Sequence, residues 1–330
     1  MRESRRNRSR HRTPNEALIT DVTSVEARSP EPASVAAVVV TFHPEPELAA
    51  RLASLLPQVG AIVVVDNGSC PADLPAGDDP AFGGRVETIA NGENLGVGAA
   101  LNQGLRRAKE LGFSWALTLD QDSSPLPNLV AAAERAFRAH PAPERLAAIG
   151  AGVVGPEGSS VSTTHAYRRL PVMITSGTLH SITAWEKLGG LREDYFIDCV
   201  DIEFCLRARA HGFDIVQATE PALDHRIGEP SRKRTLGRWM MPTNHSPLRR
   251  YYMTRNRISV WRLYVRSDGH FVLTDMRQSI REWVGILFAE TDRRAKLAAI
   301  VSGLKDGVLG RYGPRRVPRN PHQPTCGSFP

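Results

Sequence analysis

Two short apolar runs, VAAVVVTF (residues 35–42) and AIVVVDN (residues 61–67), decide the fold class. Continuous apolar runs of this length that end at polar residues are typical of strands buried on both faces of a parallel sheet. Between them, the segment Glu47–Leu56 places its leucines on one helical face,. A strand, a helix and a second strand within about 30 residues predict a βαβ unit.

The same alternation of strand and helix continues toward the middle of the chain. Its order predicts an α/β fold, in which helices cover both faces of a sheet. In such a fold, ligands bind beyond the carboxyl ends of the strands. The further strands are predicted at Arg85–Ala90, Ser114–Leu119 and Leu146–Gly150, and the further helices at Leu95–Leu111 and Asn128–Ala139.

The distribution of charge divides the chain into three parts. The net charge of +7 over 330 residues hides an acidic body between a basic amino-terminal segment and a basic carboxyl-terminal third. We expect a disordered basic tail over residues 1–34, an α/β domain over 35–245 and a basic, mainly helical extension over 246–330. No apolar run approaches the roughly 20 residues that a membrane-crossing helix needs.

The extension is predicted to form helices over Arg249–Val265, Met276–Ala289 and Asp292–Leu304. Two stretches, REWVGILFA (281–289) and RRAKLAAIVSGL (293–304), pair apolar with cationic residues, as helices at a membrane surface do. Ordinary packing against the α/β domain would give the same pattern, so both interpretations stay open. Nucleic-acid binding is not expected, because the chain carries no helix-turn-helix, zinc-finger or RNP signature.

The first motif with chemistry is Asp120-Gln121-Asp122, which directly follows a predicted strand. Polar clusters also follow the first two strands, at Thr41–His43 and Asp66–Ser69, so all three fall on the edge where ligands bind,. Carboxylates two residues apart in a turn can reach one Mg²⁺ or Mn²⁺ ion that bridges phosphates. Asp-rich turns also occur for purely conformational reasons.

A second motif, GENLGVGAALNQG (92–104), opens a predicted helix with Gly96 and Gly98. It resembles half of a dinucleotide fingerprint, but Leu101 stands in place of the third glycine and the first βα turn lacks glycines,. An NAD-dependent oxidoreductase therefore stays the alternative from a different class. The interpretation that we favour is a small-residue turn that lets a helix N-terminus approach a nucleotide.

A third motif, YFIDCVDIEFCLRARAHGF (195–213), gathers Asp198, Asp201 and Glu203 at the start of an amphipathic helix. The arginines of this helix are expected to face away from its buried stripe. Capping and the helix dipole account for one or two of the acids, but three exceed that need. A carboxylate here can accept a proton from a sugar hydroxyl.

His225 ends the short segment PALDH (221–225). A lone histidine is usually a structural residue. The functional alternative is a further metal ligand beside the carboxylates, because neutral imidazole is a common ligand.

Taken together, these motifs resemble the inverting family-2 glycosyltransferases of GT-A fold, and most of all their bacterial rhamnosyltransferase branch. The resemblance covers about residues 35–310, and its most specific part is 195–209. It implies a GT-A catalytic domain over 35–245, with a mixed, Rossmann-like sheet and helices on both faces. The motifs are TFH (41–43), VVVDNGS (63–69), NLGVGAALNQG (94–104), LTLDQDS (117–123), ITSG (174–177), FIDCVDIEFCLRARAHGF (196–213) and DHRIG (224–228).

The resemblance assigns a role to each motif. Asp120 and Asp122 match the DxD pair that holds Mg²⁺ or Mn²⁺ against the donor diphosphate, and His225 matches a histidine that can complete this metal site. Asp201 matches the general base. Val200 stands where many relatives have a first acid, so Asp198 stays the alternative base. The residues that match the nucleotide pocket are Thr41, His43, Asp66, Asn67, Asn94 and Gly96.

The implied function is a metal-dependent, inverting transfer of L-rhamnose from dTDP-rhamnose to a hydroxyl of a lipid-linked, cell-surface glycan. UDP-galactofuranose or GDP-mannose as donor would use the same mechanism. We expect a cytoplasmic protein with peripheral contact to the inner face of the cytoplasmic membrane.

Overall fold

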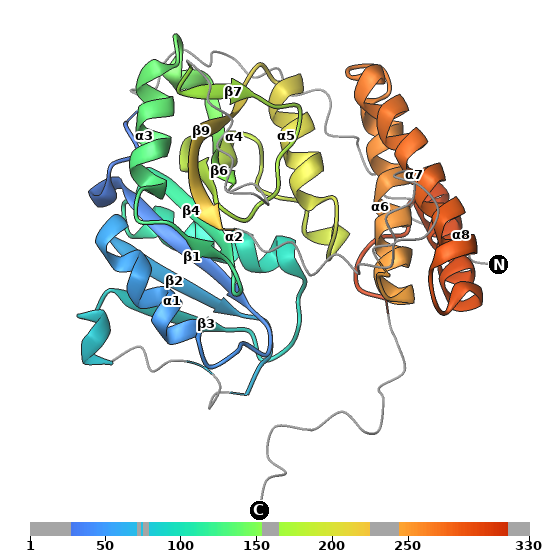
Figure 1. Ribbon diagram of the computed structural model, residues 1–330, viewed down its shortest axis with the longest axis horizontal. Coiled ribbons are helices and arrows are strands. Elements are labelled where there is room, and N and C mark those ends of the chain that lie inside the picture. Colours follow the sequence, from blue (N-terminus) through green and yellow to red (C-terminus); the bar gives the residue numbers. More distant parts are fainter. Residues whose placement is uncertain (1–27, 71–73, 75–78, 154–164, 225–243, 316–330) are drawn as a thin grey trace, which may run out of the picture.

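The computed structural model describes residues 28–70, 74, 79–153, 165–224 and 244–315. A β-sheet crosses the larger part of the molecule and carries helices on both faces, while three further helices stand together at one side (Figure 1). The expectations for the amino-terminal tail up to residue 27 and for His225 lie outside the described residues.

Five strands follow the predicted runs closely, and four were not predicted: the short β5, β7 and β8, and the long β9. The bounds of the strands are Val35–Thr41 (β1), Ala61–Asp66 (β2), Val86–Ala90 (β3), Trp115–Asp120 (β4), Ser124–Pro125 (β5), Leu146–Val153 (β6), Tyr167–Arg169 (β7), Thr178–Ser181 (β8) and Asp214–Asp224 (β9). Within the described chain they form one sheet in the order β3-β2-β1-β4-β8-β6-β9-β5, with β7 paired to β9. Strands β1 to β4 pair in parallel, whereas β8 runs antiparallel between β4 and β6. The mixed sheet is thus confirmed.

The helices also agree with the sequence pattern to within a few residues at most ends. The exception is the helix after β8, which has too few residues to show a helical period. The bounds are Leu48–Leu55 (α1), Val97–Glu110 (α2), Leu129–Ala139 (α3), Ile182–Lys187 (α4), Val200–Ala210 (α5), Pro247–Tyr264 (α6), Gly269–Ala289 (α7) and Arg293–Leu309 (α8).

Alternate residues of the central strands enter two different cores, which explains why these strands are apolar throughout. Val35, Ala37 and Val39 of β1 pack with the leucines of α1 and with α3. Ala36 and Val38 pack on the other face, with α2, α4 and α5. Val260 and Tyr264 of α6 belong to this second core, so the carboxyl-terminal extension packs directly against the sheet-bearing part.

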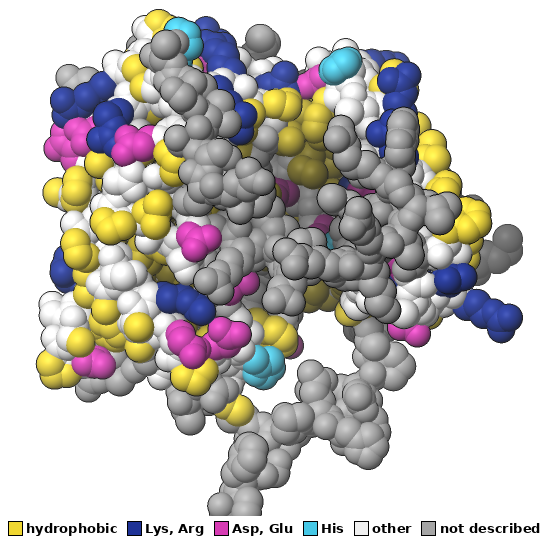
Figure 2. All heavy atoms as spheres, in the orientation of Figure 1, with side chains coloured by type: hydrophobic (Ala, Val, Ile, Leu, Met, Phe, Trp, Pro, Cys, Tyr) yellow, Lys and Arg dark blue, Asp and Glu magenta, His cyan; other side chains and the backbone are white. Residues whose placement is uncertain are grey.

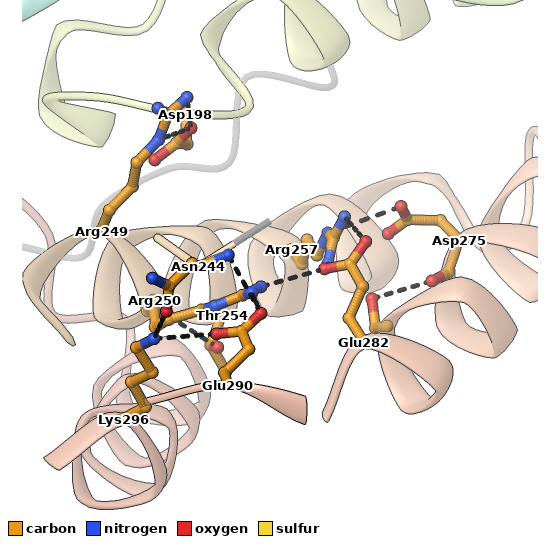
Figure 3. A network of polar contacts seen from close by, with 11 residues as sticks. Asp198, Asn244, Arg249, Arg250, Thr254, Arg257, Asp275, Glu282, Glu290 and Lys296 are labelled. Atoms are coloured by element: carbon orange, nitrogen blue, oxygen red, sulfur yellow. Dashed lines mark hydrogen bonds and ion pairs between the residues drawn. The ribbon is translucent and has the colours of Figure 1, made fainter. Parts of the chain in front are cut away.

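Buried ion pairs join the three helices of the extension (Figure 3). On α6, Arg250 pairs with Glu290 at 2.7 Å and Arg257 pairs with Glu282 of α7 at 2.9 Å. Lys296 of α8 reaches the same Glu290 at 2.9 Å. Because isolated buried charges are costly, this chain of alternating charges fixes how the helices pack. In the described ranges, no helix is both long and apolar enough to cross a membrane.

His180 is a buried titratable group at the centre of the sheet. It lies on β8 between Ala116 and Ala148 of the flanking strands, and its ring centroid is 5.3 Å from that of Phe204. Within the part of the chain that the structure describes, neither ring nitrogen has a hydrogen-bond partner. Burial therefore lowers the pKa of His180 to about 4, from an ordinary value of 6.5,.

This depressed pKa predicts a loss of stability in mild acid. Below pH 6.5 the unfolded chain binds a proton at His180 that the folded chain refuses until about pH 4,. We expect the free energy of unfolding to fall by about 2 kcal/mol more between pH 7 and pH 5 in the wild type than in His180→Leu. Urea unfolding at the two pH values measures this difference, and equal falls would contradict it.

Candidate active site

Three polar residues end neighbouring parallel strands and so lie together at one edge of the sheet. Thr41 of β1 pairs in register with Asp66 of β2, and Val40 pairs with Asp120 of β4. The buried Thr41 hydroxyl donates a hydrogen bond to Asp66 Oδ1 at 2.9 Å. The parallel strands thus bring together polar side chains that are far apart in the sequence, as the pattern predicts.

The buried carboxylate of Asp66 organises two loops at this edge. Its Oδ2 accepts hydrogen bonds from the backbone N–H groups of Gly68 and Ser69, at 3.0 and 2.8 Å. The Ser69 hydroxyl donates to Asp66 Oδ1 and accepts from the backbone N–H of His43 at 2.8 Å. His43 has a positive φ of 50°, and this hydrogen bond anchors its loop next to the one after β2.

A chain of hydrogen bonds between asparagine side chains and the Gly96 backbone joins the end of β2 to the glycine motif. Asn67 Nδ2 donates to the carbonyl of Gly96 at 3.3 Å, and Asn91 Nδ2 donates to Asn67 Oδ1 at 3.0 Å. The Asn94 side chain accepts from the Gly96 N–H at 2.9 Å. The predicted pocket residues Asn67, Asn94 and Gly96 therefore lie in contact with one another.

Gly96 lies in close contact with Phe196 of the acidic motif 195–213. Its φ is +91°, and a Cβ at this position would lie 2.6 Å from the carbonyl oxygen of Phe196. The next N–H, that of Val97, donates to the same oxygen at 2.7 Å. Only glycine fits here, because any side chain would push the start of α2 away from the loop that precedes α5.

The DxD turn is held by its middle residue. Gln121 Oε1 accepts from the backbone N–H of Phe42 at 2.7 Å, and its Nε2 donates back to the Phe42 carbonyl at 3.3 Å. Behind the turn, the hydroxyl of Ser176 accepts from the Asp120 N–H at 3.3 Å. Both Asp120 and Asp122 are exposed. Sequence reasoning missed the role of Gln121, since a glutamine between two aspartates looks like an ordinary surface residue.

Asp201, the candidate base, lies in the first turn of α5 and is half-buried. Its Oδ1 accepts a hydrogen bond from the Ile202 N–H at 2.8 Å. Burial raises the pKa of Asp201 to about 6, and the charges of Asp198 and Asp120 add to the rise. This carboxylate therefore has a pKa closer to that of an effective general base than an ordinary aspartate has,.

Asp198, the alternative base, lies in a strained loop. Phe196, Asp198 and Cys199 all have positive φ angles, of 67°, 63° and 62°, a conformation that non-glycine residues rarely adopt. Asp198 Oδ1 accepts hydrogen bonds from Arg249 of α6 at 3.2 and 3.1 Å (Figure 3), while its buried Oδ2 has no partner. Burial raises the pKa of Asp198, and Arg249 opposes that rise.

The third acid of the motif, Glu203, has a structural role. It is buried and accepts hydrogen bonds from Arg207 at 2.9 Å and from the Tyr264 hydroxyl of α6 at 2.8 Å. The expectation that the arginines of α5 face away is therefore wrong for Arg207, which also donates to the Gly190 carbonyl at 2.7 Å. A buried carboxylate needs a cationic partner, and Arg207 one helical turn away supplies it.

Two buried residues of α6 hold the strained loop. Asn256 Nδ2 lies 3.1, 2.8 and 2.9 Å from the carbonyl oxygens of Tyr195, Ile197 and Asp198. Arg255 donates to the backbone carbonyl of Tyr195 at 2.8 Å and to that of Asp194 at 3.2 Å. We call this pair the α6 clasp. The sequence carries no signal for it, because Arg-Asn within a helix looks like part of a solvated face.

The donor chemistry of the DxD turn fits a divalent cation. Asp120 and Asp122 offer exposed carboxylate oxygens, which are the ligands that Mg²⁺ and Mn²⁺ prefer,. Among the residues that the structure describes, no three His, Cys, Asp or Glu side chains gather into a complete metal site. His225, the third predicted ligand, lies outside those residues.

The sheet-bearing part of the chain is similar to known sugar transferases. Residues 36–172 match glycosyl transferase family 2. The chain is 29% identical to "dTDP-rhamnosyl transferase RfbF" of Shigella flexneri over 306 residues, which cover 85% of this chain and 97% of that protein. The matched residues 36–172 hold strands β1 to β7, so most of the sheet-bearing part of the chain is similar to glycosyl transferase family 2.

Solved structures of S. aureus TarS are similar over much of the chain. TarS residues 1–349 match at 14% identity with a TM-score of 0.47, covering 84% of this chain and 72% of that one. The same fragment in complex with UDP-GlcNAc matches at 15% identity with a TM-score of 0.47, covering 84% and 73%.

Loss of the α6 clasp is expected to impair catalysis more than donor binding. Asn256→Ala leaves buried loop carbonyls without a donor, at a cost of about 3 kcal/mol in the free energy of unfolding. Because the loop precedes Asp201, we expect kcat to fall by about 10- to 100-fold, with the KM for the donor within about twofold. Steady-state kinetics and urea unfolding measure the two effects.

Thr254→Val is the matched control on the same helix. It removes a buried hydroxyl that bonds only to the Arg250 carbonyl within α6, at 2.8 Å. We expect kcat to stay within about twofold and stability to fall by about 1 kcal/mol. Equal losses of kcat in the two variants would show that the clasp acts on stability alone.

Proposed function

We propose that this glycosyltransferase moves L-rhamnose from dTDP-rhamnose to a hydroxyl of a cell-surface glycan, with inversion at the anomeric carbon. The observation that supports the catalytic part is the position of Asp201 in the first turn of α5, where burial raises its pKa to about 6 and the charge of Asp120 adds to the rise. The name of the RfbF relative, which matches along nearly its whole length, supports the rhamnosyl donor.

Asp201 is proposed as the general base. Its carboxylate takes the proton of the acceptor hydroxyl as the hydroxyl oxygen bonds to the anomeric carbon, and the bond from that carbon to the diphosphate oxygen breaks. Attack from the face opposite the leaving group inverts the configuration, so the enzyme needs no nucleophile of its own. Asp198 suits this role less well, because Arg249 already occupies one of its oxygens.

Asp120, Asp122 and His225 are proposed to hold Mg²⁺ or Mn²⁺. When bound, the ion would supply positive charge to the leaving diphosphate. The contribution of the chain itself is orientation: Gln121 and Ser176 fix the turn from two sides, so the two carboxylates need little rearrangement,.

The nucleotide is proposed to bind over the strand edge beside this turn. The pocket residues that we assign to it are Thr41, His43, Asp66, Asn67, Asn94 and Gly96. Asp66 supports the loops rather than offering an open carboxylate, since both of its oxygens already accept hydrogen bonds.

We further propose that the acceptor is linked to a lipid and that the enzyme works at the inner face of the cytoplasmic membrane. The basic extension supports this, because cationic residues attract anionic headgroups and lipid-linked phosphates,. UDP-galactofuranose and GDP-mannose remain the alternative donors for the same mechanism.

Removal of the base should abolish transfer without weakening donor binding. Asp201→Asn keeps the size of the side chain but cannot accept the proton, so we expect kcat to fall by about 1,000-fold, with the donor Kd within about twofold. Asp198→Asn is the discriminating control, for which we expect a fall of about tenfold or less. The reverse ranking would make Asp198 the base.

A screen of donors tests the substrate. With Mn²⁺ or Mg²⁺, we expect release of the nucleotide product from dTDP-rhamnose at least about tenfold faster than from UDP-galactofuranose, UDP-glucose or GDP-mannose, and loss of that activity in EDTA. Preference for another donor would replace the rhamnosyl assignment, while activity that survives EDTA would remove the metal. If no donor releases its nucleotide in the absence of an acceptor, quenching of tryptophan fluorescence by each donor ranks the donor affinities instead.

A further inference from the structure

The outer face of α7 carries a row of exposed apolar side chains. Ile280 is 55% exposed and Phe288 is 68% exposed, although residues of this kind are usually buried. On a helix of 3.6 residues per turn, the whole row falls within an arc of about 120°. Its members, which we call the α7 stripe, are Leu273, Met276, Ile280, Val284, Leu287 and Phe288.

The α7 stripe is not the face by which the helix packs. Val272, Ser279 and Ile286 are buried, and they project from the other side of the helix. A helix that only packs against its own domain needs one apolar face. The second face of α7 is therefore available for a partner.

The acidic side chains of α7 are all turned toward α6. Asp275 and Glu282 pair with Arg257, at 3.5 and 2.9 Å, and Glu290 after the helix pairs with two buried cations (Figure 3). Residues 269–291 hold no other acid. The outward side of α7 therefore carries no carboxylate.

Basic side chains accompany the α7 stripe. Arg277 and Arg281 are exposed and lie one turn apart along its edge,. On the neighbouring α8, Arg294, Val301 and Lys305 are also exposed. Figure 2 shows the same mixture at the right-hand edge of the molecule, where hydrophobic side chains lie between lysines or arginines.

We propose that the α7 stripe is the surface by which this enzyme docks on a bilayer that contains anionic phospholipids. The inference rests on the proposed lipid-linked acceptor and names the surface that brings the enzyme to it. The apolar side chains enter the interfacial layer while the arginines contact lipid phosphates. A second copy of the chain suits this face less well, because two such surfaces would bring their arginines together.

The stretch 293–304, which the sequence pattern also suggests for a membrane surface, is used largely inside the protein. Lys296, Ala299 and Ile300 are buried. A Cβ on Gly303 would lie 2.6 Å from the carbonyl oxygen of Tyr251, so α8 lies directly against α6. Val301, Val308 and Leu309 of α8 stay exposed, but the longer row of exposed apolar side chains lies on α7.

Flotation of the full chain with vesicles tests the proposal. We expect the wild type to float with phosphatidylcholine vesicles that contain about one-third phosphatidylglycerol and to float weakly with phosphatidylcholine alone. The double variant Ile280→Gln/Phe288→Gln removes apolar contact, and Arg277→Gln/Arg281→Gln removes charge. Each is expected to lower the partition coefficient onto anionic vesicles by about tenfold or more.

Leu111→Gln is the matched control, since Leu111 is an exposed apolar residue (41%) at the end of α2. It should float like the wild type, and circular dichroism should show that all variants stay folded. A wild type that stays unbound, or an Ile280→Gln/Phe288→Gln protein that floats equally well, would overturn the proposal. So would a wild-type dimer that this variant dissociates, because the stripe would then join two copies.

Binding to vesicles needs no sugar donor, so the experiments can contradict the docking surface and the rhamnosyl donor independently of each other. A protein that floats as expected but does not turn over dTDP-rhamnose supports the docking surface and overturns the donor. A protein that transfers rhamnose at the same rate with a water-soluble acceptor but never floats keeps the proposed donor and overturns the docking surface.

Discussion

Helix α6 of the extension holds the strained loop before α5 by hydrogen bonds to the carbonyls of that loop. The position of the acidic residues in the candidate site depends on this contact. Positive φ angles at Phe196, Asp198 and Cys199 turn the loop so that several of its carbonyls find no partner within it,. The α6 clasp supplies the missing donors from Arg255 and Asn256. The extension therefore supports the candidate active site, because its first helix holds the loop from which the acidic helix starts.

At the sheet edge, hydrogen bonds from side chains hold the loops in place. Asp66 closes the loop after β2, and Gln121 ties the DxD turn to the end of β1. Asp66 accepts hydrogen bonds from hydroxyls and backbone N–H groups of the two loops, and Gln121 bonds to the backbone of Phe42. Asp120 and Asp122 lie exposed at the same edge. The site is thus organised before any ligand binds, which lowers the cost of ordering it.

In the extension, the acidic side chains pair with cations between the helices, whereas other arginines lie on the outer surface. The carboxylates of Asp275, Glu282 and Glu290 meet arginines and a lysine between the helices, where loss of one partner would leave an uncompensated charge costing about 3–5 kcal/mol. Arg277 and Arg281 stay outside beside an uncovered apolar row. One set of charges specifies how the helices pack, and the other gives the molecule a basic outer face.

The sequence alone determined strands β1 to β4 and β6, the helices between them and the edge at which polar residues collect, because burial on both faces leaves a continuous apolar pattern,. It also marked Asp120 and Asp201, whose position after a strand or at a helix start is local information. Only the tertiary structure decided that Glu203 is structural, that the α6 clasp holds the acidic loop and that β8 runs antiparallel. These depend on partners distant in the chain, and a buried polar residue looks like a solvated one until its partner is known.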